Sequence, residues 1–175
     1  MEPTGHACVR FTARLRLEPV SAAHAEDLYR LFQDPAVAEW YGVWTLEMAQ
    51  REAASIARAW ETGGVHKWMA YERSSGALVG RGGLSRVHMA GQERLEIGWV
   101  LLRLFWGQGY ATEIGRAGLA FAFKELGAEE VVAYTEARNV RSRAVMERLG
   151  FRHNQDYLSE EDGVPCVLYS LTRPS

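Results

Sequence analysis

A strand, a glycine-containing turn and the start of a helix follow one another between residues 95 and 113, and this succession constrains the fold more than any other stretch. Residues 95–102 are almost all apolar and β-favouring. Gly107 and Gly109 then allow a sharp turn and leave no side chain over the backbone amides. From Thr112 onward, apolar or small residues recur at helical spacing: Ile114, Ala117, Gly118, Phe121 and Ala122.

The turn is typical of a phosphate site, because a helix N-terminus has free N–H groups and a partial positive charge. We therefore expect a ligand with a phosphate or pyrophosphate. A P-loop would need Lys followed by Ser or Thr after the glycines, and neither follows Gly109. A dinucleotide-binding turn fits the surrounding pattern but would need a small residue where Thr112 stands. A tight turn without a ligand is the structural alternative.

Residues 106–113, Trp-Gly-Gln-Gly-Tyr-Ala-Thr-Glu, resemble the acyl-CoA pyrophosphate loop of the GCN5-related N-acetyltransferases (GNAT superfamily). The likeness is greatest to the ribosomal-protein alanine N-acetyltransferase (RimJ/RimL-like) branch, which acetylates ribosomal-protein N-termini. Gly109 and Ala111 match the second half of the superfamily pattern Gln/Arg-x-x-Gly-x-Gly/Ala. Trp106 stands where Gln or Arg is commonest, a departure that much of this branch shares.

A second segment, residues 139–151, resembles the family's Asn-x-x-Ser-x-x-x-x-Glu-Lys-Leu-Gly-Phe segment. In the family this Asn contacts the pantetheine arm and this Ser lies near the thioester sulfur, so the resemblance gives these roles to Asn139 and Ser142. The two segments occur in the family's order, and their joint occurrence is more specific than either alone. The resemblance extends over most of the chain, from Thr12 to Thr172.

The resemblance implies acetyl-CoA as cosubstrate and a set of residues that bind it. These are Trp99, Val100, Leu101, Trp106, Gly107, Gln108, Gly109, Tyr110, Ala111, Thr112, Asn139 and Ser142. Arg138, Arg141, Arg143 and Arg148 form a basic cluster, of which one or two could meet the 3′-phosphate of CoA, while a solvated helix face accounts for the others.

Size and charge narrow the class of protein. The chain has 175 residues and a net charge of −2, which favours one domain and gives no general attraction to nucleic acid or membranes. Residues 1–8 read as a flexible N-terminus without a signal-peptide pattern, and 9–175 as the N-acetyltransferase domain. Two cysteines, Cys8 and Cys166, read as reduced thiols of a cytoplasmic protein, and five scattered histidines predict no metal site.

The pattern of apolar residues predicts a mixed α/β (α+β) domain with a central, largely antiparallel sheet and about four helices. Expected strands cover residues 12–17, 67–72, 77–84, 95–102, 130–135 and 166–171, with another opening at Phe151. Three expected helices follow Ser21, Thr45 and Asn139, and another begins at Thr112. They end at Asp34–Pro35, Gly63–Gly64, Gly150 and Gly127, respectively. Residues 85–94 read as a polar connection. At least one parallel strand pair is expected, and the resemblance implies that two central strands splay around pantetheine.

Glu96 is the candidate general base, because it is an acid in an otherwise apolar strand beside Gly98. Poor solvation disfavours the charged form of a carboxylate, which suits a base that acts directly or through water. A structural ion pair near Arg94 is the alternative for Glu96. Ser142 is the candidate proton donor near the sulfur, and a solvent-facing position is its alternative. We expect a backbone N–H near Trp99 to stabilise the oxyanion.

Trp40, Tyr41 and Trp44 are the candidate acceptor-binding residues, because family members bind the acceptor near this connection between two helices. A packed aromatic corner is the alternative for this group. A homodimer contact through exposed aromatic residues here also stays open.

We interpret the chain as an acetyl-CoA-dependent N-acetyltransferase that transfers acetyl directly, in a ternary complex, to a primary amine of a protein N-terminus or a small molecule. Two alternatives stay open. A non-catalytic acyl-CoA-binding or regulatory module would bind CoA and acetylate no amine, and a nucleotide-cofactor enzyme would prefer NAD to CoA.

Overall fold

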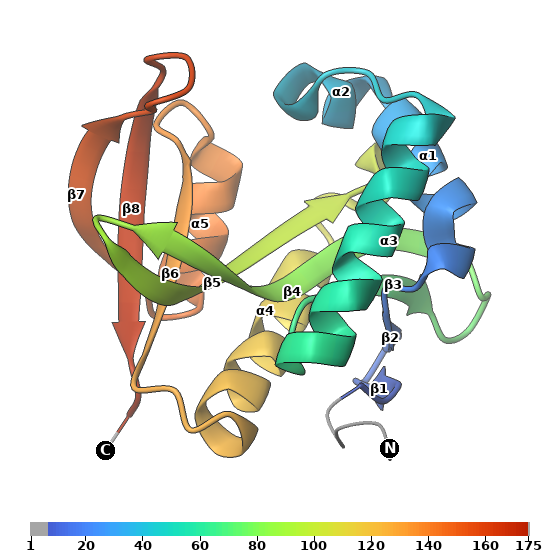
Figure 1. The fold of residues 1–175 in the computed structure, drawn as a ribbon, viewed down its shortest axis with the longest axis horizontal. Helices are drawn as coiled ribbons and strands as arrows, with labels where there is room; N and C mark the ends of the chain where they lie inside the picture. Colours follow the sequence, from blue (N-terminus) through green and yellow to red (C-terminus); the bar gives the residue numbers. More distant parts are fainter. Residues whose placement is uncertain (1–6, 175) are drawn as a thin grey trace. The chain divides into compact units, whose positions relative to one another are not determined.

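The computed structural model describes residues 7–174, in which eight strands form one sheet in the order β1-β2-β3-β4-β5-β6-β8-β7 (Figure 1). The strands are β1 (Arg10–Phe11), β2 (Leu15–Pro19), β3 (Lys67–Glu72), β4 (Leu78–Met89), β5 (Gln92–Leu101), β6 (Glu130–Glu136), β7 (Arg152–Leu158) and β8 (Pro165–Thr172). The helices are α1 (Ala25–Gln33), α2 (Pro35–Tyr41), α3 (Leu46–Gly63), α4 (Tyr110–Ala120) and α5 (Val140–Arg148). Strands β5 and β6 pair in parallel, whereas β1–β2, β2–β3, β3–β4, β6–β8 and β7–β8 are antiparallel.

This architecture confirms the predicted mixed, largely antiparallel fold, with β1 and α2 as additional elements. The flexible N-terminus expected over residues 1–8 falls largely on residues 1–6, which lie outside the described residues. Cys8 is exposed and Cys166 is buried, and both are free thiols. Among residues 7–174, no helix is long and apolar enough to span a membrane.

Helix α2 corrects the prediction that Trp40 and Tyr41 lie between two helices. Asp34 ends α1 in an extended conformation, as expected before a proline, but Pro35 then occupies the first turn of a new helix. Proline fits there because its missing N–H would have no helical partner, and the Asp34 carboxylate accepts a bond of 2.9 Å from the Ala36 N–H. Trp40 and Tyr41 therefore belong to α2.

The polar connection predicted over residues 85–94 is also wrong. Strand β4 continues to Met89, and β5 begins at Gln92 after a tight turn in which Ala90 and Gly91 have φ values of 50° and 74°. The polar residues belong to strand ends that extend beyond the core, where Arg86 and Glu93 form an exposed ion pair of 3.0 Å. Polar residues on such a hairpin resemble a loop in the sequence.

The chain forms two compact units, and the first comprises residues up to Gly83 together with Trp99–Ile114. In this unit α1 packs against α2 and α3 (Figure 1). The α3 face predicted from its spacing is buried as expected, with Ala49, Ala53, Ile56 and Trp60 at most 3% exposed. The Thr45 hydroxyl caps α3 by accepting the Met48 N–H, and Gly64 ends the helix at φ 66°. Leu15 and Leu17 of β2 are fully buried.

The second unit comprises Leu84–Gly98 and Gly115–Ser175. Strands β6, β8 and β7 pair side by side, and their buried residues include Val131, Val132, Val167 and Tyr169. After Ala120 the predicted long helix continues as a π-helical turn, Phe121–Glu125, before Gly127 at φ 65°. A Cβ on Gly115 would lie 2.4 Å from Leu149 Cδ1. Because Gly115 has no side chain, the helical segment that begins there can pass close to the end of α5.

Candidate functional site

The loop between β5 and α4 has a backbone conformation that is typical of anion sites. Gly107 and Gly109 have φ values of 72° and 84°, a region that residues with a Cβ rarely adopt. A Cβ on Gly107 would meet no atom within 4 Å. The glycine is therefore required by the conformation of the loop and not by crowding.

The N–H groups from Gly107 to Ala111 precede the regular hydrogen-bond ladder of α4. Among residues 7–174, none of them donates a hydrogen bond of good geometry, and only weaker backbone bonds close the turn over residues 106–109. The first helical bond of α4 runs from the Glu113 N–H to the Gly109 carbonyl, at 3.0 Å. Gly107, Gln108 and Gly109 are exposed, so their amides and the positive end of the α4 dipole can face a phosphate.

Side chains within the loop hold it in this form. The Trp106 indole N–H donates to the Leu101 carbonyl at 2.8 Å, and the Gln108 side-chain amide donates to the Leu104 carbonyl at 2.8 Å. Trp106, where the family pattern commonly has Gln or Arg, thus ties the loop to the end of β5.

Arg14 and Glu113 also support the loop, and neither role could be read from the sequence. The Glu113 carboxylate accepts bonds from Thr12 Oγ1 at 2.6 Å and from Arg14 Nε at 2.8 Å. Burial opposes the ionisation of Glu113, but these hydrogen bonds outweigh it and lower its pKa. The Tyr110 hydroxyl donates to Glu72, and this bond raises the pKa of Tyr110.

The end of β5 leads into this loop. Val100 and Leu101 are 8% and 7% exposed, and Trp99 is half-buried. Buried side chains therefore lie on both faces of β5 at this end. Strand β4 approaches β5 closely here, since a Cβ on Gly80 would lie 2.1 Å from the Val100 carbonyl oxygen.

Glu96 lies in the second unit as a buried carboxylate. It is 8% exposed and accepts a 2.8 Å hydrogen bond from the hydroxyl of Ser85, which is 7% exposed. Arg94, which the structural alternative would have paired with Glu96, bonds to Glu130. Glu96 is also in register with Val132 where β5 and β6 pair in parallel.

Asn139 and Ser142 lie at the start of α5 in the same unit. The Asn139 side-chain oxygen accepts the Ser142 N–H at 3.1 Å, which confirms Asn139 as the helix cap. Both residues are half-buried. The Asn139 side-chain NH₂ and the Ser142 hydroxyl have no hydrogen-bond partner among residues 7–174, so both can reach a ligand.

Two arginines of the predicted basic cluster have structural bonds. Arg143 donates to the Ala137 carbonyl at 3.0 Å and to the Tyr169 hydroxyl at 3.3 Å, and the latter bond raises the pKa of Arg143. Arg138 pairs with Glu136 at 2.7 Å. Both therefore steady the turn before α5.

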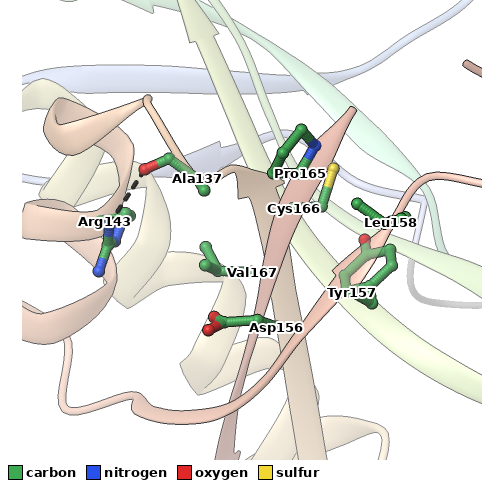
Figure 2. Close-up of a pocket in the computed structure, with 8 residues that line it drawn as sticks. All are labelled: Ala137, Arg143, Asp156, Tyr157, Leu158, Pro165, Cys166 and Val167. Atoms are coloured by element: carbon green, nitrogen blue, oxygen red, sulfur yellow. Dashed lines mark hydrogen bonds between the residues drawn. The ribbon is translucent and has the colours of Figure 1, made fainter. Parts of the chain in front are cut away.

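A cavity of about 420 Å³ lies beside this turn (Figure 2). Arg143 lines it together with groups from β7 and β8, among them Asp156, the Tyr157 ring and the Cys166 thiol. Burial raises the pKa of Tyr157 to about 12. Arg143 belongs to the basic cluster predicted to meet the 3′-phosphate, whereas the predicted loop residues, Glu96, Asn139 and Ser142 do not line this cavity. The cavity could not be predicted because it depends on the pairing of β7 with β8.

The aromatic residues near α2 pack on a buried ring in the first unit. Trp44 stacks on Phe32 with ring centroids 3.7 Å apart, and Tyr41 meets Phe32 edge-on at 5.6 Å. Tyr41 is nevertheless 50% exposed, and Val43 72%. The packed-corner interpretation thus holds for the Trp44 ring, while Tyr41 keeps a surface that a ligand can contact.

The described residues contain no group of three His, Cys, Asp or Glu side chains that could hold a metal ion. The loop residues Trp106–Thr112 and the aromatic residues belong to the first unit, whereas Glu96, Asn139 and Ser142 belong to the second.

Comparison with known proteins shows the family. Residues 14–152 match the acetyltransferase (GNAT) domain. FsC-acetyl coenzyme A-N(2)-transacetylase of Aspergillus fumigatus is 32% identical, over 98% of this chain and 77% of that protein. A putative GnaT-family acetyltransferase from Bordetella pertussis has the same fold, with a TM-score of 0.83, 24% identity and coverage of 93% and 98% of the two chains.

A putative ribosomal-protein-serine acetyltransferase from Vibrio cholerae also has this fold, with a TM-score of 0.80, 21% identity and coverage of 99% and 100%. The chain therefore belongs to the GNAT family and is an acetyl-CoA-dependent N-acetyltransferase.

Proposed function

We propose that the chain holds the pyrophosphate of acetyl-CoA on the loop after Trp106 and transfers the acetyl group directly to a primary amine in a ternary complex. The observation that carries this proposal is the glycine turn at the start of α4, whose N–H groups from Gly107 to Ala111 donate no internal hydrogen bond of good geometry among residues 7–174. The remaining contacts to the cosubstrate would come from Trp99, Val100, Leu101, Trp106, Thr112, Asn139 and Ser142.

The acceptor must first lose a proton, because an amine near neutral pH is mostly ammonium and has no free electron pair. Glu96 takes this proton, directly or through water. The nitrogen then bonds to the thioester carbon, and a backbone N–H near Trp99–Val100 donates to the oxyanion. When the C–S bond breaks, the nitrogen loses its second proton and the sulfur of CoA gains one. The Ser142 hydroxyl relays this proton: it gives its own proton to the sulfur and receives the one that the nitrogen releases, directly or through water.

The surroundings of Glu96 support its role as the base. Its burial keeps water from solvating the carboxylate fully, and the Ser85 hydroxyl fixes one carboxylate oxygen at 2.8 Å. Glu96 is in register with Val132 where β5 and β6 pair in parallel, so the backbone that carries this carboxylate is held in the sheet. Asn139 also supports the proposal, because its side-chain oxygen caps α5 and its side-chain NH₂ stays available to the pantetheine arm.

The acceptor is a primary amine, and the relatives' names describe two kinds. One name specifies transfer to an N(2) nitrogen, and another a ribosomal protein. Tyr41, half exposed beside Trp40 and Trp44, is the proposed contact for the acceptor on the first unit.

Release of CoA thiol from acetyl-CoA tests the proposal, with amino acids, polyamines and short peptides as acceptors. Glu96→Gln keeps the shape but removes the base, and should lower kcat/KM roughly a hundredfold or more at neutral pH. Glu93→Gln, an exposed change on the same strand, is the matched control and should retain activity. A Glu96→Gln enzyme with unchanged kcat/KM at every pH would remove Glu96 as the base. Binding of CoA without transfer to any amine would support a non-catalytic module.

A further inference from the structure

Arg14, which directly precedes β2, makes four contacts with the loop and the first turn of α4. Its Nη1 donates to the Gln108 carbonyl at 2.9 Å, and its Nε and backbone N–H both donate to the Glu113 carboxylate at 2.8 Å. Its guanidinium carbon lies 4.0 Å from the centre of the Tyr110 ring. One side chain thus joins three residues of a segment almost a hundred positions away in the sequence.

The bond to Gln108 fixes the direction of a peptide plane. In a trans peptide the C=O and the following N–H point in opposite directions. Since the Gln108 carbonyl points at Arg14, the Gly109 N–H points away from Arg14. Among residues 7–174 that N–H donates no internal hydrogen bond of good geometry, so Arg14 helps keep it available to a ligand.

The pair with Glu113 also changes the charge near the loop. An unpaired carboxylate in the first turn of α4 would repel a pyrophosphate, although it would suit the helix dipole. Glu113 is ionised at neutral pH because hydrogen bonds lower its pKa, despite the opposing effect of burial. The adjacent guanidinium compensates this negative charge.

Arg14 stands on fixed backbone. Its carbonyl accepts the Arg73 N–H at 2.8 Å, and the following Leu15 is fully buried. The Thr12 hydroxyl donates to the same Glu113 oxygen as the Arg14 N–H. The segment before β2 therefore acts as a rigid support from which the guanidinium reaches the loop.

We propose that Arg14 is a positioning residue for the pyrophosphate of acetyl-CoA, which it serves by orienting the Gly109 amide and compensating Glu113. This inference rests on the proposed use of the loop. Lysine is not an adequate replacement, because one ammonium lacks the planar fork that bonds to Glu113 and Gln108 together.

The test compares Kd values for CoA and for pantetheine, which lacks the nucleotide and all phosphates, by titration calorimetry. Arg14→Ala should bind CoA roughly tenfold more weakly, about the effect of one charge-assisted hydrogen bond, and pantetheine as the wild type does. Arg16→Ala is the matched control, because Arg16 also pairs with a glutamate, Glu18 at 2.6 Å, and lies over a tyrosine ring, but contacts no part of the loop.

The CoA-to-pantetheine ratio of Kd values separates positioning from general destabilisation, which would weaken both ligands. If Arg14→Ala fails to fold, Arg14→Lys is used, and it too should lose CoA affinity selectively. A wild-type ratio in the folded Arg14 variant would overturn the role of Arg14. A wild type that binds pantetheine as tightly as CoA would instead overturn the proposed pyrophosphate loop.

Discussion

His66, immediately before β3, is a histidine that the fold keeps uncharged. Its Nδ1 is buried and has no hydrogen-bond partner among residues 7–174. Burial, and then the nearby charges of Lys67 and Arg81, lower its pKa from 6.5 to about 4. The Lys67 ammonium is itself held at the Gly83 carbonyl, at 2.9 Å, so this charge stays close.

We predict that His66 makes the folded protein less stable in acid. Between pH 6.5 and about 4 the unfolded chain binds a proton that the folded chain does not, so stability from this residue is lost as the pH falls through that window. His66→Asn should remove this loss. Melting temperatures of both proteins at pH 7.5 and 4.5 check it: the variant should lose fewer degrees than the wild type, and equal losses would contradict the predicted role.

Glu96 and Ser85 show how much of the candidate site the residue types alone could predict. An acid within an apolar strand is conspicuous in the sequence, so Glu96 could be singled out. Its partner could not, because which hydroxyl faces the carboxylate depends on the register of β4 against β5. The role of Arg14 could not be predicted either, because it depends on which loop the folded chain brings next to Arg14.

At the scale of elements, the approach of β4 to β5 at Gly80 fixes the strand end proposed to contact acetyl-CoA. A Cβ there would lie 2.1 Å from the Val100 oxygen and 2.8 Å from the Leu101 Cα, and backbone atoms cannot move aside cheaply. Gly80→Ala should therefore destabilise the fold by about 1–3 kcal/mol, the usual cost of overpacking. Gly63→Ala should change stability little, because its Cβ would meet nothing within 4 Å and its φ is not positive.

Urea unfolding of both variants checks this prediction. If the midpoint of Gly80→Ala equalled that of Gly63→Ala, the two strands would not be packed as closely as described.

Helices with local end signals were predictable from sequence, and elements that depend on packing were less so. Thr45 and Gly64 mark both ends of α3, and Asn139 marks the start of α5, as predicted. Helix α2 was missed because Pro35 ends one helix and begins the next. The hairpin of β4 and β5 was missed because its exposed ends carry the polar residues of a loop.

For the whole molecule, the order of most strands and helices and the glycine turn before α4 were predictable, because both depend on short-range patterns. The pairing order that places β8 between β6 and β7 was not, since it depends on which strand edges meet. The cavity beside Arg143 depends on the same pairing (Figure 2). Membership in the family identifies acetyl-CoA as the acetyl donor. The identity of the acceptor depends on side chains that are far apart in the sequence, so short sequence patterns do not reveal it.

The most direct measurement is the melting temperature of the wild-type protein with CoA, acetyl-CoA, NAD and ATP at equal concentrations. A ligand at a hundred times its Kd stabilises the folded state by about 2.7 kcal/mol, which corresponds to roughly 5–10 °C for a domain of this size. We predict a shift of this order with CoA and acetyl-CoA and little with NAD or ATP. No shift with CoA, or a larger one with NAD, would contradict the assignment of the loop after Trp106 to acetyl-CoA.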